Sequence, residues 1–222
     1  MIINNMEEFE DELMSDLTWR KREMINLSFA VSSETTNINK SVLVRAGISL
    51  LCAHWEGYVR HASNAYIIFV SSQQIKIKDL NENFITLKMK KKISEIGTTK
   101  KVSVQQRLIH EIVDSMDSNF SINYIDRPGK RVINTDSNLN YDLFQEILKV
   151  LSVENIYETK KHYIDAMMLK NRNAIVHGEK IYFDRFDFTE LFNQVFEIME
   201  SFREQLIKVA DNQEYIKNTQ IM

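Results

Sequence analysis

Arg172, Asn173 and His177 fall within six residues of one another and could act together on a phosphate group. In an α-helix, with about 100° per residue, Asn173 and His177 would share one face, and Arg172 would lie about 140° from His177. An imidazole near a helix end can take a proton from a hydroxyl group or give one to a leaving oxygen, and a guanidinium group forms paired hydrogen bonds with a phosphate. A proton acceptor or donor, a fixed cation and a polar orienting group would suffice to cleave RNA through its 2′-hydroxyl group, without a metal ion or cofactor.

Two further groups of side chains are candidates for a supporting role. Glu56 is expected either to position Arg172 or to pair with Arg60, which lies four residues further along the chain. The candidates for contacts with an RNA backbone are Lys88, Lys90, Lys91, Lys92 and Lys170. Lysine runs usually face water, so a solvated loop is the alternative for residues 88–101. An Arg and a His near a helix end usually form surface ion pairs or cap carbonyl groups, so the spacing of Arg172 and His177 does not by itself establish catalysis.

The three candidate catalytic side chains need a helix to hold them. A helix over residues 154–177 is expected to carry them, with Ile175 and Val176 pointing into the core. Gly178 is expected to end this helix, because glycine adopts the left-handed conformation at little cost. A long helix over residues 38–72 has one apolar face and is expected to be the spine of a bundle. Apolar side chains at helical spacing predict further helices over residues 6–30, 84–96, 104–116 and 187–213, and a short one capped by Asn140 or Asp142.

The composition favours long helices in a single domain over residues 1–222. Five Gly and one Pro in 222 residues are few for a sheet protein, which needs such residues at its many turns. Residues 117–139 hold the only Pro and many Asn, Asp and Ser, so they predict an irregular insertion within that domain. Residues 75–78 alternate like a short strand.

Charge and cysteine content limit the class of protein further. The formal net charge of -3 does not indicate a nucleic-acid binder, but phosphate contacts depend on local patches. The single cysteine, Cys52, allows no internal disulfide and is expected to be a small buried side chain in a reducing cytoplasm. The N-terminal residues do not resemble a secretion signal, and the longest apolar run, residues 65–70, is too short to cross a bilayer. The sequence therefore predicts a cytoplasmic protein without a membrane segment.

The segment from Arg172 to His177 reads Arg-Asn-Ala-Ile-Val-His. It resembles the R-x4–6-H motif, with a polar residue after the Arg, of the HEPN-domain ribonucleases. Other segments resemble the MAE-type HEPN-like nucleases, near the RiboL-PSP branch. These are Trp19-Arg20 with Glu23, Ala53-His54-Trp55-Glu56-Gly57-Tyr58-Val59, and Ser137-Asn138-Leu139-Asn140. Together the segments cover most of the chain in the order that the family has.

The resemblance implies an all-α HEPN-type helical bundle and a homodimer in which the two R-x4-H helices meet in one cleft. It implies an RNA endonuclease with Arg172, Asn173 and His177 as catalytic residues and a 2′,3′-cyclic phosphate as product. It also implies a toxin or phage-defence effector, with an antitoxin protein as a partner.

One position departs from the pattern, and two other functions stay open. A related toxin group carries a Tyr two residues after the His, where its antitoxin modifies it; Glu179 stands there in this chain, which puts that modification in doubt. The first alternative is a non-catalytic HEPN module that binds nucleotide or RNA, or that acts as a dimerisation partner. The second is a regulatory helical protein that recruits another nuclease.

Overall fold

Long helices make up most of the described part of the protein. The computed structural model describes residues 1–122, 132–135, 138–181 and 185–217. Short 3₁₀ turns η1 (Ile77–Asp79) and η2 (Glu158–Lys160) and the π-helical stretch η3 (Tyr163–Lys170) lie between the α-helices. The α-helices are α1 (Met6–Ser33), α2 (Asn37–Ser72), α3 (Glu82–Thr98), α4 (Val102–Ser115), α5 (Tyr141–Val150), α6 (Asn171–Val176) and α7 (Arg185–Asp211). Since these residues contain only isolated bridges and no strand, the predicted all-α fold class is confirmed.

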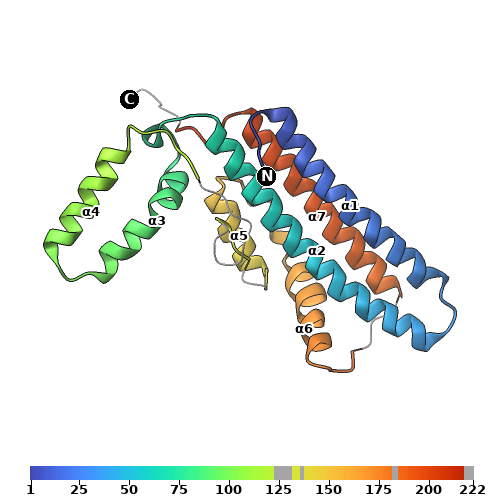
Figure 1. Ribbon diagram of the computed structural model, residues 1–222. Helices are drawn as coiled ribbons and strands as arrows, with labels where there is room; N and C mark the ends of the chain where they lie inside the picture. The colour runs from blue at the N-terminus through green and yellow to red at the C-terminus, as the bar shows by residue number, and fades with distance from the viewer. Residues whose placement is uncertain (123–131, 136–137, 182–184, 218–222) are drawn as a thin grey trace.

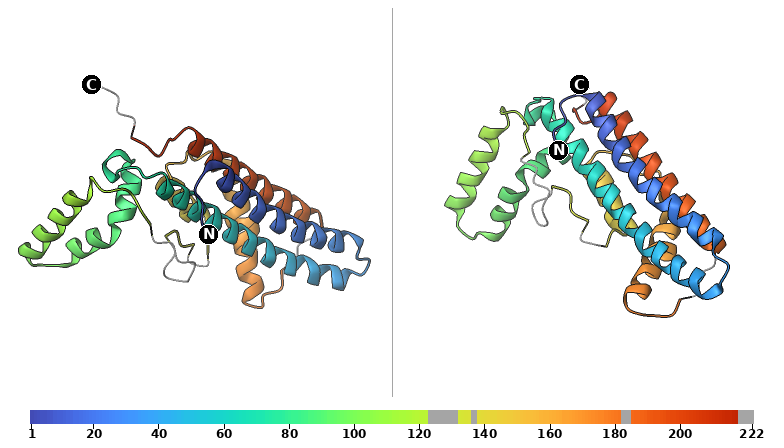
Figure 2. Two further views of the ribbon diagram at one scale, coloured as in Figure 1. Left: turned by 45° about the horizontal axis from the view of Figure 1, so that its top comes forward. Right: turned by 45° about the vertical axis from the view of Figure 1, so that its right-hand side comes forward.

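Helices α1, α2 and α7 lie side by side and form the body of a bundle (Figure 1 and Figure 2). Each buries one apolar face at helical spacing, as the sequence predicts. The fully or almost fully buried residues include Phe9, Leu13, Leu17 and Met24 on α1, and Phe188, Leu191, Val195, Met199, Phe202 and Leu206 on α7. Helix α2 is buried along most of its second half and is the spine of the bundle. Helix α6 and η3 pack against α2, and η3 also contacts α7.

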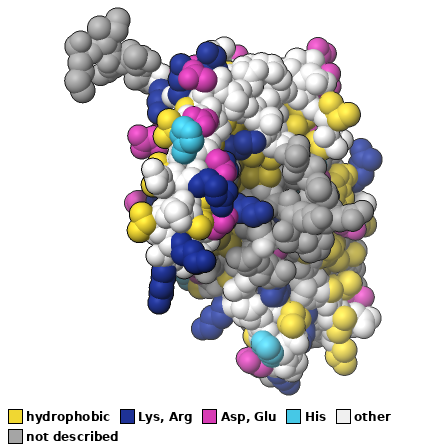
Figure 3. Space-filling view, turned by 60° about the vertical axis from the view of Figure 1, so that its left-hand side comes forward, with side chains coloured by type: hydrophobic (Ala, Val, Ile, Leu, Met, Phe, Trp, Pro, Cys, Tyr) yellow, Lys and Arg dark blue, Asp and Glu magenta, His cyan; other side chains and the backbone are white. Residues whose placement is uncertain are grey.

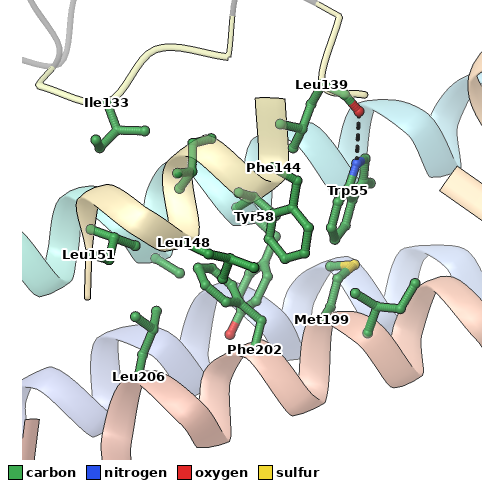
Figure 4. Close-up of a cluster of buried hydrophobic side chains, with 14 of the residues drawn as sticks. Trp55, Tyr58, Ile133, Leu139, Phe144, Leu148, Leu151, Met199, Phe202 and Leu206 are labelled. Carbon is green, nitrogen blue, oxygen red and sulfur yellow. Dashed lines mark hydrogen bonds between the residues drawn. The ribbon is translucent and has the colours of Figure 1, made fainter. Parts of the chain in front are cut away.

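An aromatic cluster joins α5 to the spine and to α7 (Figure 4). The ring of Phe144 on α5 lies edge-on to Trp55 of α2 and to Phe202 of α7, with centroid distances of 4.9 and 5.5 Å. The indole Nε1 of Trp55 donates a hydrogen bond to the backbone oxygen of Leu139, at 3.2 Å. The side chain of Asn140 caps α5 by accepting from the backbone N–H of Leu143, which confirms one of the two predicted caps. These contacts fix the middle of α2, where Glu56 lies.

Helices α3 and α4 form a hairpin that projects away from the bundle (Figure 1). The lysine-rich segment is therefore mostly helical, and the alternative of a loop over residues 88–101 is wrong for residues 88–98. The strand prediction for residues 75–78 is also wrong. Lys76 pairs with Asn119 in a single bridge, and the chain turns into η1 from Ile77 onward, which leaves too few extended residues for a ladder.

The predicted insertion over residues 117–139 is irregular wherever the structure describes it. Part of the prediction, residues 123–131 and 136–137, lies outside the described residues. The segment is tied to the spine by Asn64, which is fully buried. Its side chain accepts from the backbone N–H of Ile133 at 3.1 Å and donates to the oxygen of the same residue at 3.2 Å. The buried backbone of Ile133 thus has both its hydrogen bonds satisfied.

The helix predicted over residues 154–177 begins later than expected. The backbone N–H of Tyr157 bonds to the side chain of Asn155 at 3.0 Å, and this local turn replaces helical hydrogen bonds. Continuous helix begins only after η2. The placement of Val176 in the core is also wrong, because its side chain is 66% exposed, whereas Ile175 is half-buried against the core. None of the helices in the described ranges is long and apolar enough to cross a membrane.

Candidate functional site

The three predicted catalytic residues lie at the end of one helical segment. Arg172 and Asn173 belong to α6, and His177 is the residue that follows it. Gly178 ends the helix with a φ of 77°, as predicted. The backbone N–H of Glu179 then bonds back to the oxygen of Ala174 at 2.9 Å, a pattern typical of glycine-terminated helices. The imidazole of His177 is exposed, at the negative end of the helix dipole.

A π-helical stretch leads directly into α6. Residues of η3 follow the wider π pattern of hydrogen bonds, and regular α-helical pattern resumes at Asn171. The side chain of Asn171 donates to the backbone oxygen of Met167 at 2.7 Å, where the two patterns meet. Such stretches are rare and often occur at functional sites, because they change which side chains a helix presents.

Arg172 faces the spine helix. Its Nη1 donates to the Oδ1 of Asn173 at 3.0 Å. Its guanidinium group also lies beside the thiol of Cys52 on α2. Burial raises the pKa of that thiol, and the hydrogen bond with Arg172 offsets part of the rise. Cys52 is therefore a buried thiol, as expected, and it packs against a predicted catalytic side chain.

Arg172 and His177 open onto two separate hollows of the surface. The first, of about 380 Å³, is lined by Arg172 and Val176 together with Ser49, Ala53, Glu56 and Arg60 of α2. The second, of about 420 Å³, is lined by Asn173, Ala174, His177 and Glu179 together with Asp165, Leu169 and Lys170. The pair predicted to share a face, Asn173 and His177, does share one hollow. Within a single chain, however, the guanidinium and the imidazole point to different sides of α6.

Glu56 forms the predicted pair with Arg60 and lies in the neighbourhood of Arg172. It is almost fully buried and lines the same hollow as Arg172. One carboxylate oxygen accepts from the Oγ1 of Thr135 at 2.8 Å and lies 3.7 Å from Nη1 of Arg60. Thr135 was not anticipated from the sequence, because it lies 79 residues from Glu56 in an irregular segment. The other residues of α2 in this hollow could have been found, since positions 49, 53, 56 and 60 repeat along one helix face.

The candidate lysines lie in two places. Lys170 lines the hollow of His177. Lys88, Lys90 and Lys91 line a different and larger hollow beside α3. Lys92 lies outside that hollow and forms an ion pair with Glu111 of α4, at 3.1 Å. The structure thus brings only one of the five candidate lysines next to His177.

The two N-terminal segments that carry the resemblance contact each other across α1 and α2. The guanidinium of Arg20 pairs with Asp16 at 2.7 Å and lies over the ring of Trp19, 4.5 Å from its centre. It also fills the space beside Gly57, where a Cβ atom would lie 2.5 Å from its Nη1.

One turn away, Nε2 of His54 lies 2.8 Å from the carboxylate of Glu23. Burial is the main cause that lowers the pKa of His54, and the charge of Arg20 lowers it further, against the opposing effects of Glu23 and Asp16. Together these contacts join α1 to α2 and do not line either hollow at α6.

Comparison with known proteins gives one match. The model of the family described as RiboL-PSP-HEPN matches residues 15–208. This range includes α6, the spine helix and the predicted site residues. No curated protein and no solved structure matches the chain.

Proposed function

The chain belongs to the RiboL-PSP-HEPN family, and we propose on this premise that it is a metal-independent RNA endonuclease whose active site forms at a homodimer interface. The observation that carries the proposal is that Arg172 and Asn173 lie on one short helix at the surface and His177 directly follows it. These groups supply a proton acceptor or donor, a fixed cation and a polar orienting group. Transesterification of RNA needs no more than these three.

His177 acts on the protons of the reaction. Its exposed imidazole takes the proton from a ribose 2′-hydroxyl, whose oxygen then attacks the adjacent phosphorus. The imidazolium formed in this way then gives its proton to the 5′-oxygen that leaves. The products are a 2′,3′-cyclic phosphate and a free 5′-hydroxyl. DNA lacks the attacking hydroxyl group, so the reaction is specific for RNA.

Arg172 and Asn173 act on the phosphate. The planar guanidinium group binds two phosphate oxygens and stabilises the charge that grows on them in the transition state. The bond between Nη1 of Arg172 and Oδ1 of Asn173 holds the two side chains together in the free protein. Glu56 lies in the hollow of Arg172 and has the role of a positioning residue.

A second copy of the chain would complete the site. Within one chain, Arg172 and His177 line different hollows, so a phosphate that binds both needs groups from two chains. Val176 lines the hollow of Arg172 and is 66% exposed. Phe29, Ile38 and Val42 are 74%, 80% and 61% exposed where α1 runs into α2, at the end of the bundle that also carries α6 (Figure 1). Soluble proteins rarely leave such apolar side chains uncovered close together, which supports an interface between two copies here.

The proposed biological role is that of a toxin or phage-defence effector held in check by an antitoxin protein. Uncontrolled RNA cleavage would stop growth. Expression of the wild-type chain is therefore expected to arrest cell growth, whereas expression of the His177→Ala variant is not. Glu179 stands where a related group carries the Tyr that its antitoxin modifies. The proposal therefore includes an antitoxin that inhibits this protein by some means other than modification of a Tyr at that position.

One observation favours a different function. In a single chain Arg172 already contacts Asn173 and Cys52, as a structural residue would. A non-catalytic HEPN module that binds RNA or nucleotide, or that dimerises with a partner protein, would keep this arrangement and lack the chemistry.

Cleavage of RNA by the purified dimer in the presence of EDTA separates the two functions. Arg172→Ala and His177→Ala are each expected to slow cleavage by about a hundredfold or more. His110→Ala is the matched control, because this histidine is exposed on α4, far along the chain from α6. If both site variants cleave RNA as fast as the control, the proposed active site is wrong.

A further inference from the structure

Basic residues are concentrated in the α3–α4 hairpin. From the start of α3 to the end of α4, residues 82–115, the chain has seven Lys and Arg and four acidic residues, Glu82, Glu95, Glu111 and Asp114, although the whole chain has a net charge of -3. The basic residues are Lys88, Lys90, Lys91, Lys92, Lys100, Lys101 and Arg107. Dark blue Lys and Arg side chains recur down the side of the molecule that carries the hairpin (Figure 3). The hairpin is thus a local positive region on an acidic protein, and such a region attracts polyanions.

A hollow of about 990 Å³ lies along this part of the hairpin. One side consists of α3 residues, including Lys88, Lys90 and Lys91, which we call the α3 lysine face. Ser94, Thr98 and Ser121 continue the polar lining, Glu95 is the one acidic residue among the described lining residues, and the apolar lining comes from Leu87, Ile122 and Val132. The lining residues of α3 run from position 87 to 98, a length of about 16 Å along the helix. The hollow is long enough for an extended chain of several phosphates.

The lysines of this helix differ in the partners they already have. Lys92 pairs with Glu111, and Lys88 donates to the backbone oxygen of Ser121. Lys90 and Lys91 are exposed, and no carboxylate within the described ranges pairs with either. Two cations are therefore available at the hollow for an external anion.

We propose that the α3 lysine face binds the sugar–phosphate backbone of single-stranded RNA, as a docking surface separate from the cleavage site at α6. The inference rests on the proposed function in one respect, since the strand held here is the one that α6 cleaves. Binding itself requires no cleavage. None of the described residues that line the hollow is aromatic, so their contacts are with phosphates and sugars and do not select a base sequence. A nucleic-acid strand is favoured over an acidic protein because it presents one charge at every nucleotide along such a row of cations and hydroxyl groups.

The test measures binding without cleavage. A fluorescent single-stranded RNA of mixed sequence is titrated with the full-length His177→Ala protein, and affinity is followed by anisotropy between 50 and 300 mM KCl. The test variant adds Lys90→Gln and Lys91→Gln. The matched control instead adds Lys149→Gln and Lys208→Gln, which remove two exposed lysines from α5 and α7. Each phosphate contact contributes about 0.7 to the slope of log affinity against log salt for a single strand, so the test variant should lower the slope by about 1.4 and weaken binding about tenfold or more at 50 mM KCl.

The outcomes are distinct. Equal slopes and affinities in the test variant and the control overturn the proposal, and so does RNA binding that is lost equally in both. Polyglutamate of similar length serves as the second ligand. If it binds as tightly as RNA and loses affinity with the same two substitutions, the surface is one for acidic protein and the RNA assignment is wrong. Failure of the proposed function would be seen in the separate RNA cleavage assay, as unchanged cleavage by the Arg172→Ala and His177→Ala variants.

Discussion

Replacing Gly47 by Ala would add one methyl group where three helices meet. A Cβ atom at this position of α2 would lie 2.6 and 2.7 Å from two ring carbons of Phe188 on α7, and 3.4 Å from Leu27 on α1. The ring of Phe188 is fully buried, so it cannot swing into solvent to make room. Either the ring leaves its preferred rotamer or α2 and α7 move apart.

Two opposing effects decide whether Gly47→Ala raises or lowers the free energy of unfolding. Ala is favoured over Gly inside a helix by about 1 kcal/mol. Overpacking of a filled core typically costs about 1 to 3 kcal/mol, and two contacts below 3 Å against a buried ring place this site at the upper end. The expected net result is a loss of about 1 to 2 kcal/mol in the free energy of unfolding. For a chain of this length that corresponds to a fall in Tm of about 2 to 8 °C.

Gly97 supplies the matched control for a thermal melt followed by circular dichroism. A Cβ atom there would meet nothing within 4 Å, so Gly97→Ala should keep or raise stability, by up to about 1 kcal/mol. A Gly47→Ala protein that melts at or above the wild-type temperature would refute the packing described between α2 and α7.

Three further predictions concern the core, the contact between α1 and α2, and the candidate site. Trp55→Phe should cost about 1 to 2 kcal/mol in urea unfolding, because the buried oxygen of Leu139 loses its donor. Burial lowers the pKa of His54 in the folded protein, so the unfolded chain binds a proton at this residue more readily. The Tm of the wild-type protein should therefore fall as the pH drops through about 6.5. The His54→Asn variant should show a smaller fall. Glu56→Gln should slow RNA cleavage about tenfold with little change in Tm, because the charge proposed to position Arg172 is removed from the hollow that both residues line. Unchanged cleavage contradicts that role.

The helices could be predicted from the sequence because each buries one apolar face. Phe9, Leu13 and Leu17 show this on α1, where their spacing gave both the helix and its buried side. The same reasoning placed Gly178 at the end of the site helix and Asn140 at the start of α5. These features depend on neighbours within one or two turns, which is the range over which sequence patterns act.

Features that depend on distant residues could not be predicted in this way. The pairing of Lys76 with Asn119, which ended a predicted strand, joins positions 43 residues apart. The sequence left Glu56 with two alternatives, because its place beside Arg172 depends on how α6 packs on α2, and Thr135, which reaches Glu56 from an irregular segment, was not predicted. Val176 was placed in the core because it follows Ile175 in an apolar run. The helix in fact ends there with its last turn at the surface, so the side chain is exposed.

The site itself was predicted in part. The shared face of Asn173 and His177 followed from their spacing, and the structure places both in one hollow. The same geometry turns Arg172 toward α2, so its separation from His177 within one chain agrees with the expected angle of about 140°. What a single chain cannot contain is the arrangement of two such helices in a dimer.

Complementation between two inactive variants tests most directly whether the active site is shared by two chains. Arg172→Ala and His177→Ala proteins are mixed, unfolded and refolded together so that subunits exchange, and RNA cleavage is measured in EDTA. If the site takes Arg172 from one chain and His177 from the other, each mixed dimer regains one complete site, and random pairing returns about a quarter of wild-type activity. If the mixture cleaves no faster than the separate variants while refolded wild type is active, the shared site is contradicted.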